Sequence, residues 1–284
     1  YERKFHRSID LNFLLATMLK SSSSATAVKE VEMQEKDAAV PRAKEAKLRA
    51  LRGYSYLNAL FFARHRRQLV KPVYYRLAAA GALFAAGVVF FFVNRGAAVQ
   101  LSRNLAARLP LFIYIMYFMT VADKAGRAMF YNCDKDMLRY AWYRRPQTIL
   151  KNFRIRLVRV ALYDLAIAAA VCLAAAGFCL LCGAPLLAAD FLLFCAAVLL
   201  LSVLFTAHHL CLYYIFQPYS ESLKVKNPFY SAVNLFMYTL CFLCLQIKVG
   251  GLAFTLAVLG FTVLYIAGAL ALVYRLAPRT FRVK

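Results

Sequence analysis

Residues 186–216 read LLAADFLLFCAAVLLLSVLFTAHHLCLYYIF, the longest apolar stretch in the chain. Its only Asp, Glu, Lys, Arg or His residues are Asp190 near the start and the pair His208 and His209 near the end. An α-helix needs about 20 apolar residues to cross the roughly 30 Å hydrocarbon layer of a bilayer. The stretch therefore predicts a transmembrane helix, and it directs attention to the other apolar stretches of the chain.

Five further apolar stretches accompany it, so that the sequence predicts six transmembrane helices. Hydrophobic residues make up 63% of the 284 residues, which is more than a soluble globular domain usually carries. The stretch 109–122 is short, and it reaches spanning length only if its helix begins near Leu105. We therefore expect an all-α, polytopic membrane protein with spans at 77–93, 109–122, 160–182, 186–216, 228–245 and 252–272.

The positive charges predict the orientation of these spans. All but four of the 36 Lys and Arg residues fall in segments on one side of the predicted topology, and an excess of Lys and Arg marks the cytoplasmic side. The excess persists when the long segment 1–76 is left out, because short loops carry most of the orientation signal. The predicted cytoplasmic segments are 1–76, 123–159, 217–227 and 273–284, and the predicted external loops are 94–108, 183–185 and 246–251.

The net charge of +23 is thus mainly an orientation signal. Anionic headgroups on the cytoplasmic side are the natural partners of such a basic surface. Nucleic acid is not expected, because the aromatic residues lie mostly in the spans and not in a basic groove. These patterns predict a multi-pass protein of the cell membrane with both chain ends in the cytoplasm.

The segment before the first span predicts two parts. Residues 1–40 read as a cytoplasmic segment and flexible linker that includes four consecutive serines at 21–24. Residues 41–76 read as a basic amphipathic helix, which in this position usually lies in the membrane interface. The start at Tyr1 leads us to expect further chain upstream of the six-span domain at 77–284, with its cytoplasmic loop at 123–159.

Cysteines and polar residues in the spans suggest few chemical sites. The pairs Cys179/Cys182 and Cys241/Cys244 share helix faces at C-x-x-C spacing, but their apolar flanks favour packing over metal binding. We expect no metal and no cofactor. Asn234 and Gln246 are candidates for a substrate path or for hydrogen bonds between helices. The sequence leaves open whether Asp164, Asp190 and His208 are functional.

Motifs for hydrolysis are missing, so the chain is not expected to be an enzyme. It contains no G-K-[ST] phosphate loop, no G-x-S-x-G turn and no H-E-x-x-H pair. The string DKAGRA at 123–128, followed by Asp134 and Asp136, faintly resembles the metal-binding signature of the CDP-alcohol phosphatidyltransferases. It lacks that family's first acidic pair and its Asp-Gly step. A membrane-embedded lipid-modifying enzyme of this type stays as one alternative, and a non-catalytic scaffold subunit of a membrane complex as another.

The most specific segment is 130–157, which reads FYNCDKDMLRYAWYRRPQTILKNFRIRL between the second and third spans. An aromatic residue and Asn, an acid, an apolar pair, a Pro and a basic amphipathic run follow one another into a span. This order resembles the permeases of exporter-type ABC transporters, in which a loop at this place docks on the ATPase subunit. The six spans and the preceding basic helix agree with the resemblance.

The resemblance implies a role and partners for this chain. It would be a transport subunit that moves a substrate by alternating access, powered by a separate ABC ATPase subunit. It would also pair with a second six-helix permease unit, of which this chain could be one half. The residues implied to form a rigid coupling plug are Asp134, Asp136, Tyr140, Trp142, Tyr143 and Pro146.

Overall fold

The computed structural model of the chain describes residues 48, 50–220, 227–246 and 252–282. The predicted segment 1–40 and the first residues of the predicted helix 41–76 lie outside this part. The described residues form helices joined by short connections, and no β-strand occurs among them. The predicted all-α class is confirmed.

Five helices in the described part are long and apolar enough to cross a membrane. This indicates a multi-pass membrane protein. The helix α11 (Pro228–Cys244) is apolar but shorter, so six spans remain a prediction. The five long elements are α4 (Arg66–Val93), the composite run Leu105–Met137, α9 (Pro146–Leu181), α10 (Ala189–Phe216) and α12 (Leu252–Thr280).

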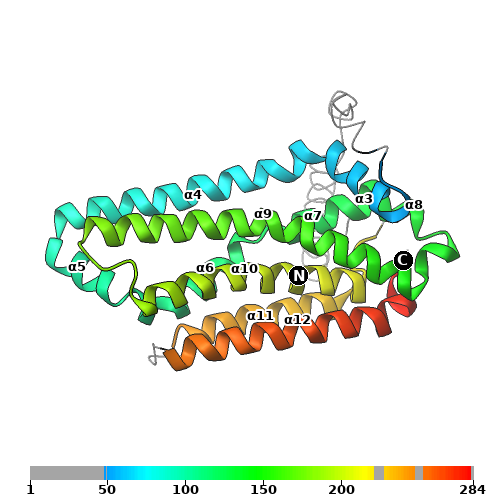
Figure 1. The fold of residues 1–284 in the computed structure, drawn as a ribbon. Coiled ribbons are helices and arrows are strands. Elements are labelled where there is room, and N and C mark those ends of the chain that lie inside the picture. The colour runs from blue at the N-terminus through cyan, green and yellow to red at the C-terminus, as the bar shows by residue number, and fades with distance from the viewer. Residues whose placement is uncertain (1–47, 49, 221–226, 247–251, 283–284) are drawn as a thin grey trace, which may run out of the picture.

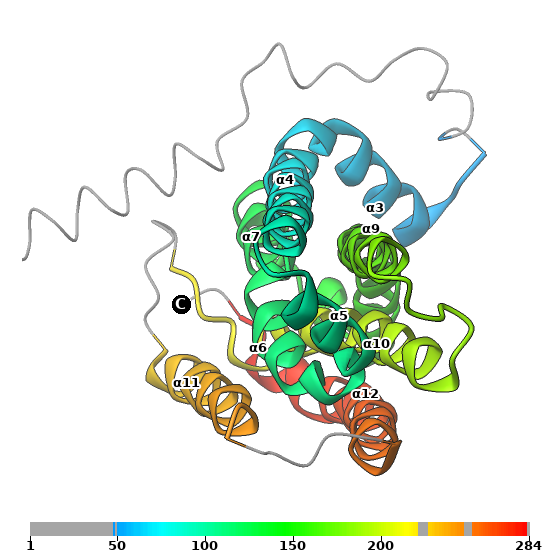
Figure 2. The ribbon, with the colours of Figure 1, turned by 90° about the vertical axis from the view of Figure 1, so that its left-hand side faces the viewer.

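The long helices run roughly side by side as one elongated bundle (Figure 1). The short helix α5 (Arg95–Arg103) closes one end, and α3 (Gly53–Arg64), α8 (Lys135–Met137) and the last residues of α12 lie at the other. Seen end-on, α11 lies beside the second span and α12 beside α10 (Figure 2), and these are also packing pairs. We call the end with α8 the loop end and the end with α5 the far end.

The helix boundaries before the first predicted span differ from the prediction. The described part of the predicted helix 41–76 contains two helices: α3 ends at Arg64, and α4 begins at Arg66. The basic residues before the predicted start at 77 are thus the first turns of the span itself. In α3, Phe61 and Phe62 are buried, and the helix packs against α9 instead of standing apart from the bundle.

The second span is longer than predicted and is interrupted near its middle. The run Leu105–Met137 comprises the 3-10 turn η2 (Leu105–Arg108), α6 (Leu109–Met119), α7 (Ala122–Met129), the π-helical turn η3 (Phe130–Asp134) and α8. At Thr120 the backbone is extended, with ψ of 139°. Most of the predicted loop 123–159 is therefore helical, and only 138–145 separates α8 from α9.

Asp164 on α9 supports this interruption. Its carboxylate accepts hydrogen bonds from the Val121 N–H at 2.8 Å and from the Thr120 hydroxyl at 2.7 Å. The Arg76 guanidinium donates to the Thr120 carbonyl oxygen at 2.7 Å. A broken helix within a membrane is tolerated only where protein groups satisfy the freed backbone atoms. Asp164, which the sequence left undecided, thus has a structural role.

Candidate coupling surface and its buried ion pair

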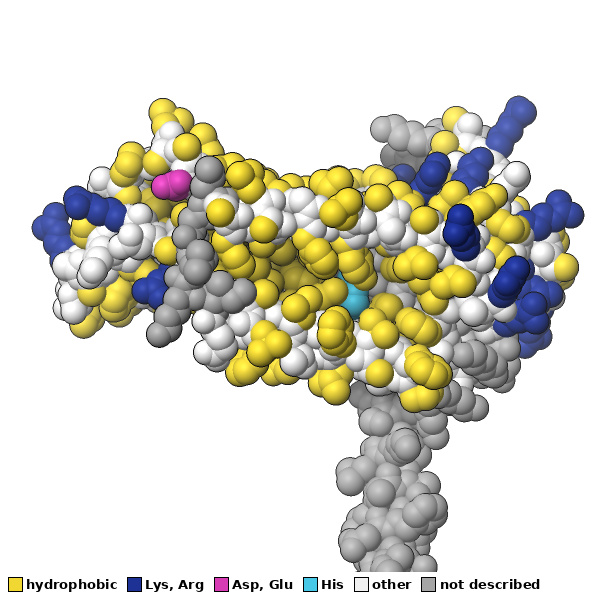
Figure 3. All heavy atoms as spheres, turned by 90° about the horizontal axis from the view of Figure 1, so that it is seen from below, with side chains coloured by type: hydrophobic (Ala, Val, Ile, Leu, Met, Phe, Trp, Pro, Cys, Tyr) yellow, Lys and Arg dark blue, Asp and Glu magenta, His cyan; other side chains and the backbone are white. Residues whose placement is uncertain are grey.

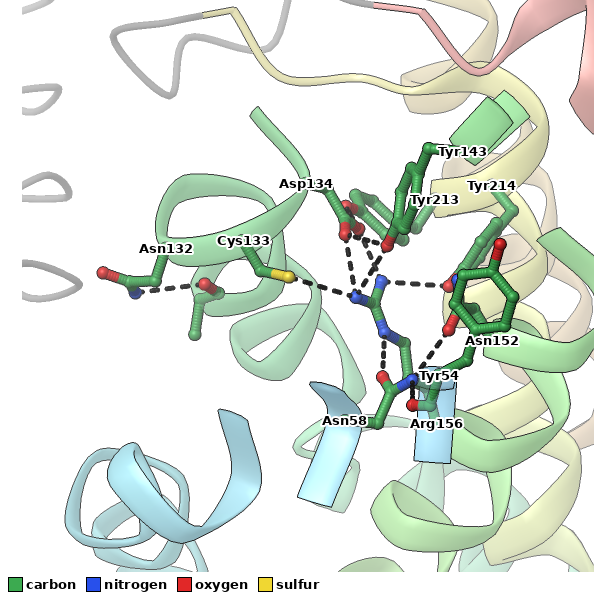
Figure 4. A network of polar contacts seen from close by, with 11 residues as sticks. Tyr54, Asn58, Asn132, Cys133, Asp134, Tyr143, Asn152, Arg156, Tyr213 and Tyr214 are labelled. Atoms are coloured by element: carbon green, nitrogen blue, oxygen red, sulfur yellow. Dashed lines mark hydrogen bonds and ion pairs between the residues drawn. The ribbon is translucent and has the colours of Figure 1, made fainter. Parts of the chain in front are cut away.

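A buried ion pair organises the loop end of the bundle (Figure 4). The Arg156 guanidinium on α9 donates to both oxygens of Asp134, with Nη1 to Oδ2 at 2.5 Å and Nη2 to Oδ1 at 2.8 Å. Both side chains have no exposed surface. A two-point pairing of guanidinium and carboxylate fixes direction as well as distance. It therefore locks the π-helical turn to α9 in one orientation.

Tyrosine hydroxyl groups fill other hydrogen-bonding positions of this pair. Tyr143 and Tyr213 donate to Asp134 at 2.8 and 2.5 Å, and Tyr214 lies 3.0 Å from Arg156 Nη1. A buried charge is tolerated when it is paired and its other hydrogen-bonding positions are filled. Burial is also the largest reason that the pKa of Tyr143 lies well above its ordinary value. The Tyr143 phenol therefore stays protonated and remains a donor.

The same network ties in the helix α3. Arg156 Nε donates to Asn58 Oδ1 at 2.8 Å, and Asn58 Nδ2 donates to Asn152 Oδ1 at 2.7 Å. Tyr54 also shares a 3.0 Å hydrogen bond with Thr148. Through these contacts α3, the π-helical turn, α9 and α10 meet at one arginine.

The structure divides the six predicted coupling residues into two groups. Asp134 and Tyr143 are buried in the network, so they anchor the segment and do not face a partner. Tyr140 and Trp142 are 55% and 42% exposed. Asp136 and Pro146 are also exposed, and Pro146 is the first residue of α9.

Two residues of the exposed group, Tyr140 and Trp142, form an aromatic ledge together with the half-buried Tyr54 of α3. Ring centroids of Trp142 lie 6.2 Å from those of both Tyr54 and Tyr140. Trp142 also meets the buried Tyr143 edge-on at 5.7 Å. The exposed Arg139 and Arg145 flank the ledge in the chain. Aromatic and arginine side chains of this kind are the usual anchors of protein interfaces.

The string that resembles a phosphatidyltransferase forms a separate cluster. Asp123 pairs with Arg127 at 2.8 Å and accepts hydrogen bonds from Tyr219 at 3.1 Å and Tyr230 at 2.9 Å. Asp134 is held by Arg156, as described above. Across the described residues, no three His, Cys, Asp or Glu side chains are grouped so that they could hold a metal ion.

The other polar residues fall at different depths. Asp190 is exposed in the first turn of α10, where a carboxylate favours the helix dipole. Gln246 is exposed just beyond α11. His208 is buried and the half-buried Asn234 lies beside it, and His208 Nδ1 is 2.7 Å from the Tyr265 hydroxyl. Of the two predicted path residues, only Asn234 faces other polar groups.

Sequence reasoning missed Arg156 and the two tyrosines of α10. Arg156 looked like one of several basic residues in the run after Pro146, and Tyr213 and Tyr214 like interfacial aromatics. The four-residue spacing of Asn152 and Arg156, which places both on one face of α9, was the available signal.

Comparisons with known proteins add no relative. No family model, no curated protein and no solved structure matches this chain.

Proposed function

We propose that this chain is the membrane-spanning subunit of an ATP-driven exporter that carries no nucleotide site of its own. The observation that carries the proposal is the aromatic ledge, exposed between the second and third long helices and fastened to α9 through Asp134 and Arg156. A segment that receives force from a partner must be exposed at its contact surface and firmly held behind it. The ledge has both properties.

The network behind the ledge provides a route for motion. Trp142 packs on Tyr143, Tyr143 bonds Asp134, and Asp134 pairs with Arg156 in the body of α9. Displacement of the ledge by an ABC ATPase subunit would therefore move α9 and α10 together. A second six-helix unit would supply the other wall of the path for alternating access.

In this proposal the protein lies in the cell membrane, and its loop end faces the cytoplasm. Lys and Arg gather at the ends of the molecule and leave an apolar middle (Figure 3). The C-terminal end of α12 lies at the loop end, so it would be cytoplasmic too (Figure 1). Anionic lipid headgroups would contact the exposed arginines there.

No observation among the described residues favours the alternative of a lipid-modifying enzyme. A phosphatidyltransferase needs several carboxylates that converge on a divalent cation, whereas Asp123 and Asp134 each bind an arginine and tyrosine hydroxyls. The scaffold alternative predicts a ledge that binds a protein but no ATP hydrolysis coupled to it, so the same experiment separates it.

The test is partner retention by the tagged full-length chain. Trp142→Ala is expected to weaken association with an ATP-hydrolysing subunit at least about tenfold, because aromatic anchors commonly contribute about 2 kcal/mol or more. The matched control is Phe92→Ala, since Phe92 is 78% exposed at the far end. Bound partner is measured by labelling with a photoreactive ATP analogue and by ATP hydrolysis of the purified complex. Full retention by Trp142→Ala, or no nucleotide-binding partner on the unaltered chain, contradicts the proposal.

A further inference from the structure

A cavity of about 430 Å³ lies at the far end, between α4, α6 and α9, and we call it the far-end cavity. Figure 2 looks along the bundle from this end and shows α5 beside the ends of these three helices. Leu83 and Phe90 on α4 and Leu111 on α6 line the cavity and are exposed on the outside of the bundle. The far-end cavity therefore opens sideways, toward the acyl chains of the surrounding membrane.

Two phenylalanine rings of the lining lie close to glycines of the facing helix. A Cβ atom at Gly177 on α9 would lie 2.9 Å from the Phe84 ring on α4, and one at Gly87 on α4 would lie 3.1 Å from the Phe178 ring on α9. The helices α4 and α9 are therefore in close contact here, and the far-end cavity remains beside that contact. Unfilled space deprives the lining of van der Waals partners, so an acyl chain that fills it is stabilised.

One charged residue, Arg108, lines this otherwise uncharged cavity. Arg108 is exposed and lies directly before α6, at the level where an apolar helix begins. It makes no hydrogen bond or ion pair with any residue that the structure describes. The segment 94–108 also contains Arg95 and Arg103 and no Asp or Glu, so the charge around the mouth of the cavity is positive.

We propose that the far-end cavity binds an anionic phospholipid, with one acyl chain inside the cavity and the phosphate at Arg108. A guanidinium binds phosphate through two parallel N–H donors, and the apolar lining matches the chain. The sideways opening lets the second acyl chain stay in the bilayer. A net negative headgroup is preferred because the exposed acid at this end, Asp190, does not pair with Arg108. Such binding needs no ATPase subunit, so it goes beyond the proposed function.

The test uses the full chain in nanodiscs of phosphatidylcholine, with a phosphatidylglycerol that carries a diazirine in one acyl chain as the probe. Photolabelling is expected on the cavity-lining peptides of α4 and α6. Per molecule, unlabelled phosphatidylglycerol should displace the probe about fivefold better than phosphatidylcholine, the factor that corresponds to about 1 kcal/mol for one basic residue near a lipid surface.

Two pairs of variants separate the headgroup contact from the chain contact. Arg108→Gln should remove the preference for phosphatidylglycerol, whereas Arg103→Gln alters an exposed arginine outside the lining and should keep it. Ala86→Phe fills the far-end cavity and should abolish labelling of its lining. Ala85→Phe changes the adjacent exposed alanine of α4, which does not line the cavity, and should leave labelling unchanged.

Several outcomes would overturn the inference. Equal displacement by phosphatidylcholine would mean a cavity for acyl chains without headgroup recognition, and stronger displacement by palmitate would mean a single-chain anion. Equal effects of Arg103→Gln and Arg108→Gln would mean general attraction to a basic surface. Displacement from the unaltered chain tests the headgroup preference even if Arg108→Gln does not fold. Binding is measured without an ATPase subunit, so failure here leaves the result of the Trp142→Ala experiment independent.

Discussion

The loop end and the far end of this bundle are held together by different interactions. At the loop end, buried tyrosines and the Asp134–Arg156 pair join four elements through directed hydrogen bonds. At the far end, the second buried cluster consists mostly of Leu, Ala, Phe and Cys side chains and packs without a buried ion pair among the described residues. Directional bonds fix one arrangement, whereas apolar contacts between membrane helices rest on van der Waals packing, which is not directional.

The far end is also more loosely filled. The far-end cavity of about 430 Å³ lies between α4, the second span and α9, in addition to an apolar groove of about 270 Å³ beside α11. Phe84 and Phe178 reach across it to Gly177 and Gly87, at distances that leave no room for a larger residue without a shift of the ring. Under the proposed function, we expect rearrangement to be concentrated at the far end, while the loop end moves as one body.

The largest expected effect is the loss of Arg156. Arg156→Met leaves Asp134 buried without its cation, which should cost about 3–5 kcal/mol of stability. The measurement is the midpoint of unfolding in one detergent, compared with Arg154→Met, which alters an exposed arginine on the same helix. Adding Asp134→Asn to Arg156→Met should recover part of the loss. Equal effects of the two single variants would remove the basis for the contrast between the ends.

Tyr143→Phe should have the next largest effect on stability. It deletes one hydrogen bond to a buried carboxylate, and bonds to charged groups are worth about 1.5–3 kcal/mol. The control is Tyr140→Phe, because the Tyr140 side chain is mostly exposed and should tolerate the change. Reduced stability of Tyr140→Phe with no change for Tyr143→Phe would reverse the roles assigned to these residues.

Thr206→Val tests a polar contact deeper in the bundle. The Thr206 hydroxyl donates to Asp164 at 2.6 Å, and hydrogen bonds between membrane helices contribute about 0.6 kcal/mol on average and about 1.7 at most. Thr239→Val is the control, since its exposed hydroxyl donates to the carbonyl of Leu235 on its own helix. Unfolding midpoints that do not differ between the two variants would count against a structural role for Asp164.

The smallest effect is expected for the cysteines of the far end. Replacing Cys179 and Cys182 together by Ala should cost about 1 kcal/mol or less, because only Cys179 is buried and its sulfur is about the size of one methyl group. Partner retention and thermal stability are the measurements. Stoichiometric zinc in the purified protein that disappears in this variant would show that the sulfurs bind metal instead of packing.

Hydropathy predicts the long helices well because a span is a local property of the chain. The stretch quoted first, 186–216, corresponds closely to α10 (Ala189–Phe216). The same reasoning did not find that α4 starts at Arg66, because a basic turn continues a helix as readily as it precedes one. It also did not find the break at Thr120, which depends on Asp164 from another helix.

The sequence predicted which segment contains the candidate site, but not which of its residues are buried and which are exposed. The pattern of 130–157 drew attention to the exposed Tyr140 and Trp142, yet it gave no means to separate them from the buried Tyr143. The burial of Asp134 depends on Arg156, 22 residues later, and on Tyr213, 79 residues later. Such pairings are set by tertiary packing, which neither helix periodicity nor charge counting records.

The π-helical turn Phe130–Asp134 has a consequence for how chain length can vary here. A π turn behaves as one residue inserted into an α-helix. Deleting any single residue from it would restore regular helix and rotate everything that follows by about 100°. Asp134 would then turn away from Arg156, and the aromatic ledge would leave its support. Insertions and deletions should therefore be rejected at 130–134 but accepted in the connection between α9 and α10. Homologous sequences should then keep a constant number of residues at 130–134 and vary in length between α9 and α10.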